Sequence, residues 1–164
     1  MKSTVAIFDS HWNALNAVAM LKNRSYPIDQ VSLMGQARNV ENYLNIKSVE
    51  PIKSGTTSVS TVIASTLGLI PGVSIFAIPG YGFVFGAGPV KKKLASFITG
   101  PDKGNGIESL LTKIGIENDK INEYKEYLET GKYLVIAHGN EAEVEKAQFI
   151  LIKGLKHIEL SVLN

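Results

Sequence analysis

Hydrophobic and polar positions predict a first β-α-β unit at the start of the chain. Residues 4–8 form a short apolar run that is typical of a buried strand. Ser10 then stands at an N-cap position, and apolar residues recur at helical spacing up to residue 21. A turn at Tyr26-Pro27 leads into patchy apolar alternation that predicts a strand ending at Gly35. We therefore assign residues 1–35 to this unit.

The last part of the chain repeats this plan. Residues 132–138 read KYLVIAH, a continuous apolar stretch that predicts a central strand. Asn140 and Glu143 have the spacing of a capping box, and an apolar stripe at helical spacing follows until Gly154. Alternation over residues 157–162 predicts a final strand. Residues 132–164 therefore form a second β-α-β unit.

Two such units in 164 residues predict a single α+β domain over residues 1–164. The fold that joins them most simply is the ferredoxin-like split β-α-β sandwich, with a four-stranded antiparallel sheet. Here the connection between its second and third strands is long. It holds an apolar, mostly helical hairpin at residues 54–100 and connecting helices at residues 101–131.

The long connection contains its own helical patterns. Residues 59–70 predict one helix, and Pro71-Gly72 and Pro79-Gly80 are strong breakers. Further helices are expected at residues 89–99, 107–114 and 119–130, the last two closed by Gly115 and Gly131. The glycines between residues 80 and 88 favour a loop or a tight hairpin turn.

Charge is absent from one part of this connection. Residues 54–90 contain no Asp, Glu, Lys or Arg, so the 17 basic and 15 acidic residues all lie elsewhere. A membrane span needs about 20 apolar residues. The predicted helix at residues 59–70 would be only about 18 Å long, and the next one carries Lys91, Lys92 and Lys93. We expect the hairpin to pack on protein, with lipid contact through these lysines as the alternative.

Composition narrows the remaining function classes. A net charge of +2 does not favour a nucleic-acid partner. The chain has no cysteine, which excludes disulfides and thiolate metal sites and fits a cytoplasmic location. The apolar run at the start is broken by Asp9, so we expect no signal peptide.

Few residues have the type and spacing that are typical of a catalytic or metal-binding site. Asp9 and His11 follow the first strand and His157 precedes the last, so the topology brings them to one end of the sheet as weak candidates for a zinc site. His138 is expected at the opposite end. No nucleotide or catalytic motif accompanies these residues, so we expect neither a cofactor nor an enzyme.

Several segments resemble the bacterial general stress protein 17M family, a group of heat-induced stress proteins. They are residues 78–82 (IPGYG), 86–90 (GAGPV), Gly115-Ile116, Tyr124 and the strand that begins at Gly131. The resemblance covers about residues 60–140 and is looser in the N-terminal unit. It implies a ferredoxin-like domain with a hydrophobic hairpin insert, and it supplies no catalytic residues. The chain departs from the family pattern at Lys91, Lys92 and Lys93, where small apolar residues are usual, and at Glu117, where proline is common.

Three functional hypotheses follow. The preferred one is a soluble, non-enzymatic stress-associated protein that forms a homodimer around the apolar insert, because a monomer would expose that surface. The residues expected at this contact are Val62, Leu67, Leu69, Ile70, Ile75, Phe76, Ile78, Tyr81, Phe83, Phe85, Val90, Leu94, Phe97 and Ile98. The alternatives are a peripheral membrane protein that docks through the hairpin and Lys91, Lys92 and Lys93, and a sensor of a metal or of an unknown small molecule.

Overall fold

The computed structural model describes residues 2–36, 70, 73–78, 81–100, 106–154 and 159–163, with only the backbone of 153–154 and 159–163. The helix predicted at residues 59–70 lies almost wholly outside these ranges. The described elements are strands and helices that alternate in the order expected for two β-α-β units with further elements between them.

The first unit follows its sequence pattern closely. Strand β1 (Lys2–Phe8) leads into helix α1 (His11–Asn23), and strand β2 (Val31–Gln36) follows a single 3-10 turn. The Ser10 hydroxyl accepts a hydrogen bond from the Asn13 amide, at 3.1 Å, as its N-cap position predicts. The strand, helix and strand expected in this part of the chain are therefore present in that order.

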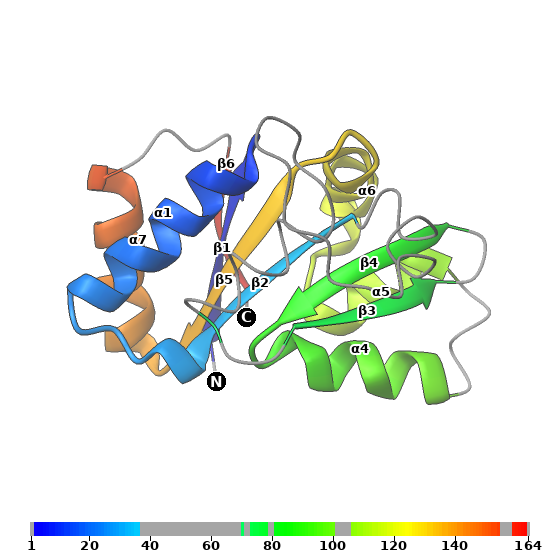
Figure 1. Cartoon of the computed structure of the whole chain (residues 1–164), viewed down its shortest axis with the longest axis horizontal. Helices are drawn as coiled ribbons and strands as arrows, with labels where there is room; N and C mark the ends of the chain where they lie inside the picture. The colour runs from blue at the N-terminus through cyan, green and yellow to red at the C-terminus, as the bar shows by residue number, and fades with distance from the viewer. Residues whose placement is uncertain are drawn as a thin grey trace, which may run out of the picture.

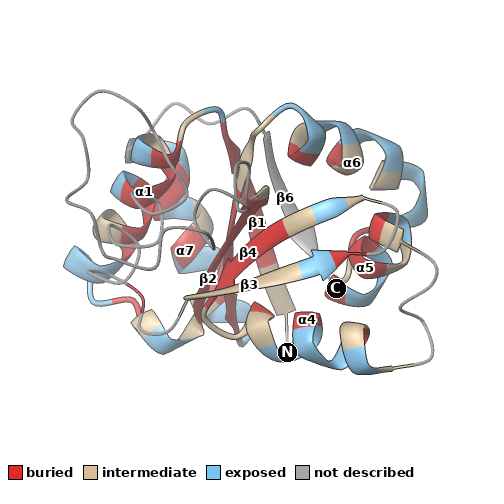
Figure 2. Ribbon diagram, turned by 45° about the vertical axis from the view of Figure 1, so that its right-hand side comes forward, coloured by how far each residue is buried: buried red, intermediate tan, exposed pale blue. Residues whose placement is uncertain are grey.

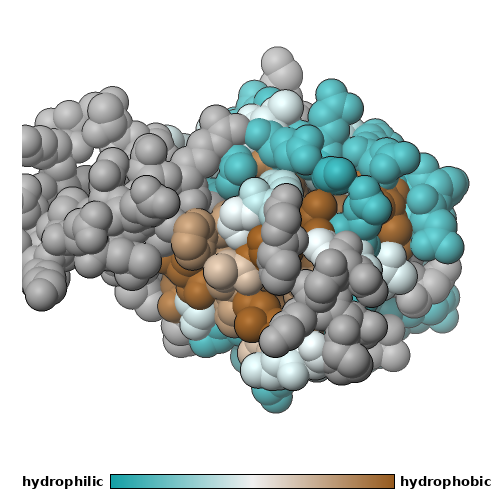
Figure 3. Space-filling view, turned by 90° about the vertical axis from the view of Figure 1, so that its right-hand side faces the viewer, coloured by the Kyte–Doolittle hydropathy of each residue, from teal (hydrophilic) through white to brown (hydrophobic). Residues whose placement is uncertain are grey.

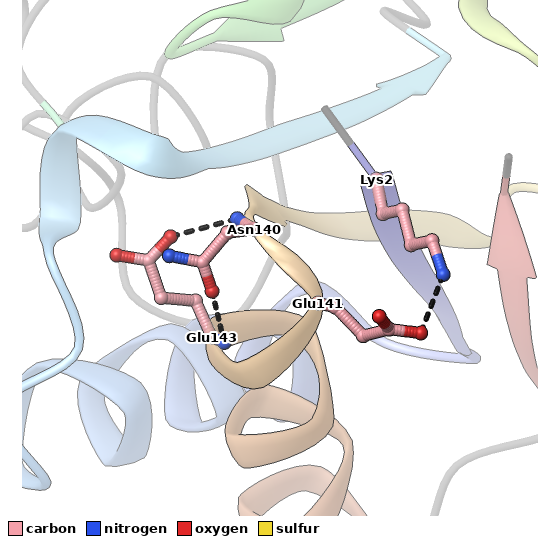
Figure 4. A network of polar contacts seen from close by, with 4 residues as sticks. All are labelled: Lys2, Asn140, Glu141 and Glu143. Carbon is pink, nitrogen blue, oxygen red and sulfur yellow. Dashed lines mark hydrogen bonds and ion pairs between the residues drawn. The ribbon is translucent and has the colours of Figure 1, made fainter.

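The second unit contains strand β5 (Tyr133–Gly139), helix α7 (Glu141–Gly154) and strand β6 (Glu159–Leu163). The Asn140 side chain accepts from the Glu143 amide at 2.9 Å, and the Glu143 carboxylate accepts from the Asn140 amide at 2.8 Å. Figure 4 shows this reciprocal pair beside the ion pair of Lys2 and Glu141. The predicted capping box therefore starts α7.

The strands form one antiparallel sheet in the order β3-β4-β2-β5-β1-β6. Strand β5 lies between β1 and β2, and β1 lies between β5 and β6, so each β-α-β unit receives a strand of the other. Residues far apart in the sequence thus pair directly: Ser3 lies opposite Leu163. The predicted α+β class is confirmed.

The apolar insert differs from the prediction. Over its described residues it begins as two strands, β3 (Val73–Ile78) and β4 (Gly82–Ala87), and not as a mostly helical hairpin. Strand β4 pairs with β2, so the insert adds two strands to the sheet and gives it six instead of four. The glycines at residues 80–88 had favoured a loop or a tight hairpin turn. A tight turn does join β3 to β4 before Gly82, but Gly86 lies within β4 and Gly88 directly follows it.

Close packing explains two of these glycines. A Cβ atom at Gly86 would collide with the Leu94 side chain, and one at Gly88 would collide with the Val31 carbonyl oxygen. Gly88 also has a φ of +80°, which residues with a Cβ rarely adopt. Glycine at these positions lets the chain turn from β4 into the next helix while it stays against the sheet.

Three further helices follow the hairpin. They are α4 (Val90–Thr99), α5 (Gly106–Ile114) and α6 (Ile121–Glu129), and the last two are followed by Gly115 and Gly131 as predicted. Their apolar faces are buried: Leu94 and Phe97 of α4 and Tyr124 of α6 are inaccessible to solvent. The helices predicted at residues 89–99, 107–114 and 119–130 are confirmed with small shifts of their ends.

Helices cover both faces of the sheet, which gives three layers (Figure 1). Helices α1 and α7 pack on one face, where Ala6, Val135 and Ala137 contribute to the core. Helices α4, α5 and α6 pack on the other, where Val5 and Ile136 contribute. Figure 2 shows the central strands buried between these layers. The alternation of neighbouring residues between two cores explains why β5 reads as a continuous apolar run.

None of the helices that the structure describes is long and apolar enough to cross a bilayer.

Candidate functional site

The most connected polar group of the described residues surrounds His138, near the end of β5. The ring is 8% exposed and lies on the sheet face that α4 covers. Its Nδ1 atom is 2.9 Å from the Ser3 Oγ on β1, and its Nε2 atom is 3.0 Å from the Ser32 Oγ on β2. Both nitrogens of one imidazole are thus engaged by hydroxyls from the two neighbouring strands.

This hydrogen-bond chain continues into helix α4. The Val90 amide, at the first residue of the helix, donates to the Ser32 Oγ at 2.9 Å. Since the Ser32 Oγ accepts this hydrogen bond, its own hydroxyl group can donate to Nε2 of His138. The tautomer that satisfies every group therefore carries its proton on Nδ1 and donates to Ser3. His138 and Ser32 together attach the start of α4 to the sheet.

Electrostatics keep this imidazole neutral. Burial, and secondarily the positive charge of Lys93, lowers the pKa of His138 to about 4. A neutral ring whose two nitrogens are both hydrogen-bonded offers no free atom for a substrate. The arrangement is suited to holding elements together more than to proton transfer.

The backbone carbonyl group of His138 makes a second polar contact. The Tyr26 hydroxyl donates to the His138 carbonyl oxygen at 2.5 Å. Burial, with a smaller contribution from the negative charge of Glu143, raises the pKa of Tyr26 to about 12. The next residue must be small: a Cβ at Gly139 would lie 2.6 Å from the Glu143 carboxylate. This end of the sheet is therefore tightly filled around the start of α7.

Asp9 and His11, two of the candidate metal residues, lie at the end of the sheet opposite His138. Phe8 lies opposite Tyr133 and Ser3 lies opposite His138, so the end of β1 that precedes Asp9 and His11 is at the far end of the sheet. His157 lies outside the described residues. Among the residues that the structure describes, no three His, Asp or Glu side chains are grouped as metal ligands.

His11 itself is buried in aromatic surroundings. It is 1% exposed, and its ring centroid lies 4.5 Å from that of Trp12 and 6.1 Å from that of Tyr133. Its Nε2 atom has no hydrogen-bond partner in the described part of the chain. Burial lowers the pKa of His11, so this ring is also neutral at neutral pH. The Asp9 carboxylate accepts from the Asn13 side chain at 3.2 Å.

The residues predicted for an association surface fall into three groups. Val62, Leu67 and Leu69 lie outside the described residues. The chain's own core already covers Ile70, Ile78, Phe85, Val90, Leu94 and Phe97. The half-buried members, which keep surface for a partner, are Ile75, Phe76, Tyr81, Phe83 and Ile98.

The three lysines predicted for lipid contact lie in the first turn of α4. Lys92 and Lys93 are exposed and Lys91 is half-buried. The first turn contains no acidic residue, and no ion pair joins these lysines to another described side chain. Positive charges at the N-terminus of a helix oppose its macrodipole, so their placement does not stabilise α4.

Sequence reasoning missed the contacts of His138 and the strands of the insert. The apolar segments VSIFAI and GFVFGA of β3 and β4 carried a strand signal that the surrounding glycines concealed. No local signal joins Ser3, Ser32 and His138, which only the pairing of β1, β5 and β2 brings together.

Comparisons with protein-family models, with curated proteins and with solved structures found no match to this chain.

Proposed function

We propose that this chain is a non-enzymatic stress-associated protein that forms a homodimer through its apolar insert. The observation that carries the proposal is the set of half-buried apolar side chains on the β3–β4 hairpin and α4, namely Ile75, Phe76, Tyr81, Phe83 and Ile98. They belong to a segment, residues 54–90 with the helix that follows, whose first part has no charge. Ile75 and Phe83 lie on the α1 side of the sheet, and Phe76, Tyr81 and Ile98 lie on the α4 side, so apolar side chains are partly accessible on both faces here. Accessible apolar surface of this kind is typical of an interface.

The surface view supports this choice. Figure 3 looks onto the side of the molecule where β3, β4 and helices α4–α6 lie, and apolar atoms are exposed there. Hydrophilic residues gather along the upper part of the same view. Covering apolar surface with a second copy is worth roughly 25 cal/mol for each Å² removed from water.

We also propose that the fold belongs to the ferredoxin-like family. The strand order β6-β1-β5-β2 is that of a split β-α-β sheet, and we take these four strands as a ferredoxin-like core to which β4 and β3 were added. The resemblance to general stress protein 17M supports the same assignment. Its glycine-proline segment falls where β4 turns closely into α4, at Gly86, Gly88 and Pro89.

Light scattering coupled to size-exclusion chromatography tests the homodimer. The full chain should elute with twice the mass of its 17.8 kDa monomer at micromolar concentration. A single species of monomer mass over a hundredfold range of concentration would show that the proposed dimer does not form.

Membrane-surface binding is the second candidate, and the exposed Lys92 and Lys93 favour it. Basic side chains near anionic headgroups contribute about 1 kcal/mol each to binding. Co-flotation with vesicles rich in acidic lipid, at low salt, should then occur and should be lost on replacing all three lysines by glutamine. Equal flotation of the two proteins would exclude a role for these lysines.

A further inference from the structure

Strand β3 lies at one edge of the sheet. Its inner edge pairs with β4 from Val73–Ala87 to Ile78–Gly82, and no strand of the described residues pairs with its outer edge. Figure 2 shows β3 as the last strand on this side, mostly half-buried along its length. In an antiparallel strand, alternate residues direct both backbone polar groups to the same side. The outer edge of β3 therefore presents a row of donors and acceptors.

The sequence of β3 does nothing to protect that edge. Edge strands usually carry charged residues or proline, which prevent pairing with another chain. Strand β3 reads VSIFAI and contains neither. The strand at the opposite edge, β6, begins with Glu159. Of the two sheet edges, only β3 consists entirely of uncharged residues.

We propose that the occupant of this edge is a second copy of the chain, with β3 of each subunit paired antiparallel across a twofold axis. This inference rests on the proposed homodimer and specifies how the subunits meet. The two sheets then continue into each other, and backbone hydrogen bonds supplement the apolar contacts. Figure 1 shows the edge on the side of the molecule away from α1 and α7.

The uncharged composition of β3 favours pairing with the same strand of a second subunit. Pairing about a twofold axis places the residues near the axis opposite themselves or a close neighbour of the same strand, and like charges in that position are destabilising. An uncharged strand avoids this repulsion. Val73 and Ile75 lie on the α1 side of the sheet and Phe76 on the α4 side, so apolar side chains would meet on both faces. Such cross-strand pairs contribute about 0.2–1 kcal/mol each.

Single cysteines test the arrangement, because the chain has none of its own. We would make Ser74→Cys, Ile75→Cys, Phe76→Cys and Ala77→Cys separately and oxidise each protein mildly. A disulfide requires Cα atoms within about 7 Å, whereas each step away from the axis adds roughly 7 Å between equivalent residues. Intersubunit crosslinking should therefore be strong at one or two adjacent positions and should fall steeply on either side. Ala142→Cys, at an exposed alanine of α7, is the matched control and should not crosslink.

A charge at the edge provides a second readout. Ala77 is exposed, so Ala77→Lys should leave the fold intact by circular dichroism while it places like charges near the axis. We expect dimerisation to weaken at least tenfold, and Ala142→Lys to leave it unchanged. A dimer that persists in Ala77→Lys and crosslinks at none of the four β3 positions would overturn the strand pairing but leave the homodimer standing. A protein that is monomeric at every concentration would overturn both.

Discussion

The two buried histidines have opposite surroundings. His138 uses both ring nitrogens, on Ser3 and Ser32, and so connects three elements of the fold. His11 is buried still more fully among aromatic rings, and its Nε2 atom has no partner among the described residues. The pKa of each is lowered by burial. Because the hydrogen bonds differ while the desolvation is shared, we expect His138 to contribute more to stability than His11.

The largest effect should come from replacing the ring that is fully hydrogen-bonded. His138→Phe removes both hydrogen bonds, leaves the hydroxyls of Ser3 and Ser32 without that partner and introduces a larger ring. Unsatisfied polar groups and overpacking together should lower the free energy of unfolding by about 4 kcal/mol. Urea denaturation measures this loss. A loss below about 1 kcal/mol would mean that the ring does not hold the strands together.

Acid should reproduce most of this effect in the unmodified protein. The unfolded chain binds a proton at His138 near pH 6.5, whereas the folded protein binds it only near a pKa of about 4. The stabilisation from the neutral ring is therefore complete above pH 6.5 and is lost as the pH falls towards 4. The difference corresponds to about 3 kcal/mol.

The measurement is the free energy of unfolding between pH 7 and pH 4. Subtracting the same curve for His138→Phe removes the contribution of carboxylates and of His11. Parallel curves for the two proteins would show that His138 does not titrate in this range.

A smaller effect should follow from cutting the link between the sheet and α4. Ser32→Ala leaves the Val90 amide and the His138 Nε2 atom without this hydroxyl, which should cost about 2 kcal/mol. Ser10→Ala, which removes the cap of α1, should cost only about 1 kcal/mol.

Hydrogen exchange distinguishes this local effect from a general loss of stability. The Val90 amide should exchange faster in Ser32→Ala than the decrease in global stability accounts for. Unchanged local protection at Val90 would contradict a role for Ser32 in attaching the helix.

The smallest effect is expected at His11. His11→Phe keeps an aromatic ring beside Trp12 and Tyr133 and removes a nitrogen that has no partner in the described part of the chain. The free energy of unfolding should change by less than about 1 kcal/mol. A loss as large as that of His138→Phe would remove the distinction between the two histidines.

Local signals in the sequence predicted most of the two β-α-β units. Ser10 and the Asn140–Glu143 pair cap their helices as their spacing indicated, because a cap depends on residues only three positions apart. The strands of the insert were not predicted. Gly86 and Gly88 suggested a loop, but they are required by the approach of Leu94 and Val31, which lie in other elements.

The site around His138 could not be predicted from the sequence either, because its residues also come from different elements of the fold. Ser3 and His138 become neighbours through the pairing of β1 with β5, and Ser32 joins them through the pairing of β2 with β5. Neither serine has a local pattern that separates it from the other serines of the chain. Only the register of the sheet selects them.

The position of β1 has a consequence for how the chain matures during synthesis. Both neighbours of β1 in the sheet, β5 and β6, lie within residues 133–163, although β1 itself begins at Lys2. Once the residues up to Ala87 have left the ribosome, β2, β4 and β3 can already pair, whereas β1 still has no partner on either side. The sheet can be completed only after β5 and β6 have been synthesised. Pairing between strands so far apart in the sequence is slow. A nascent chain that stalls before residue 133 keeps the apolar residues of β1 unpaired, and it is this intermediate that a chaperone would need to protect.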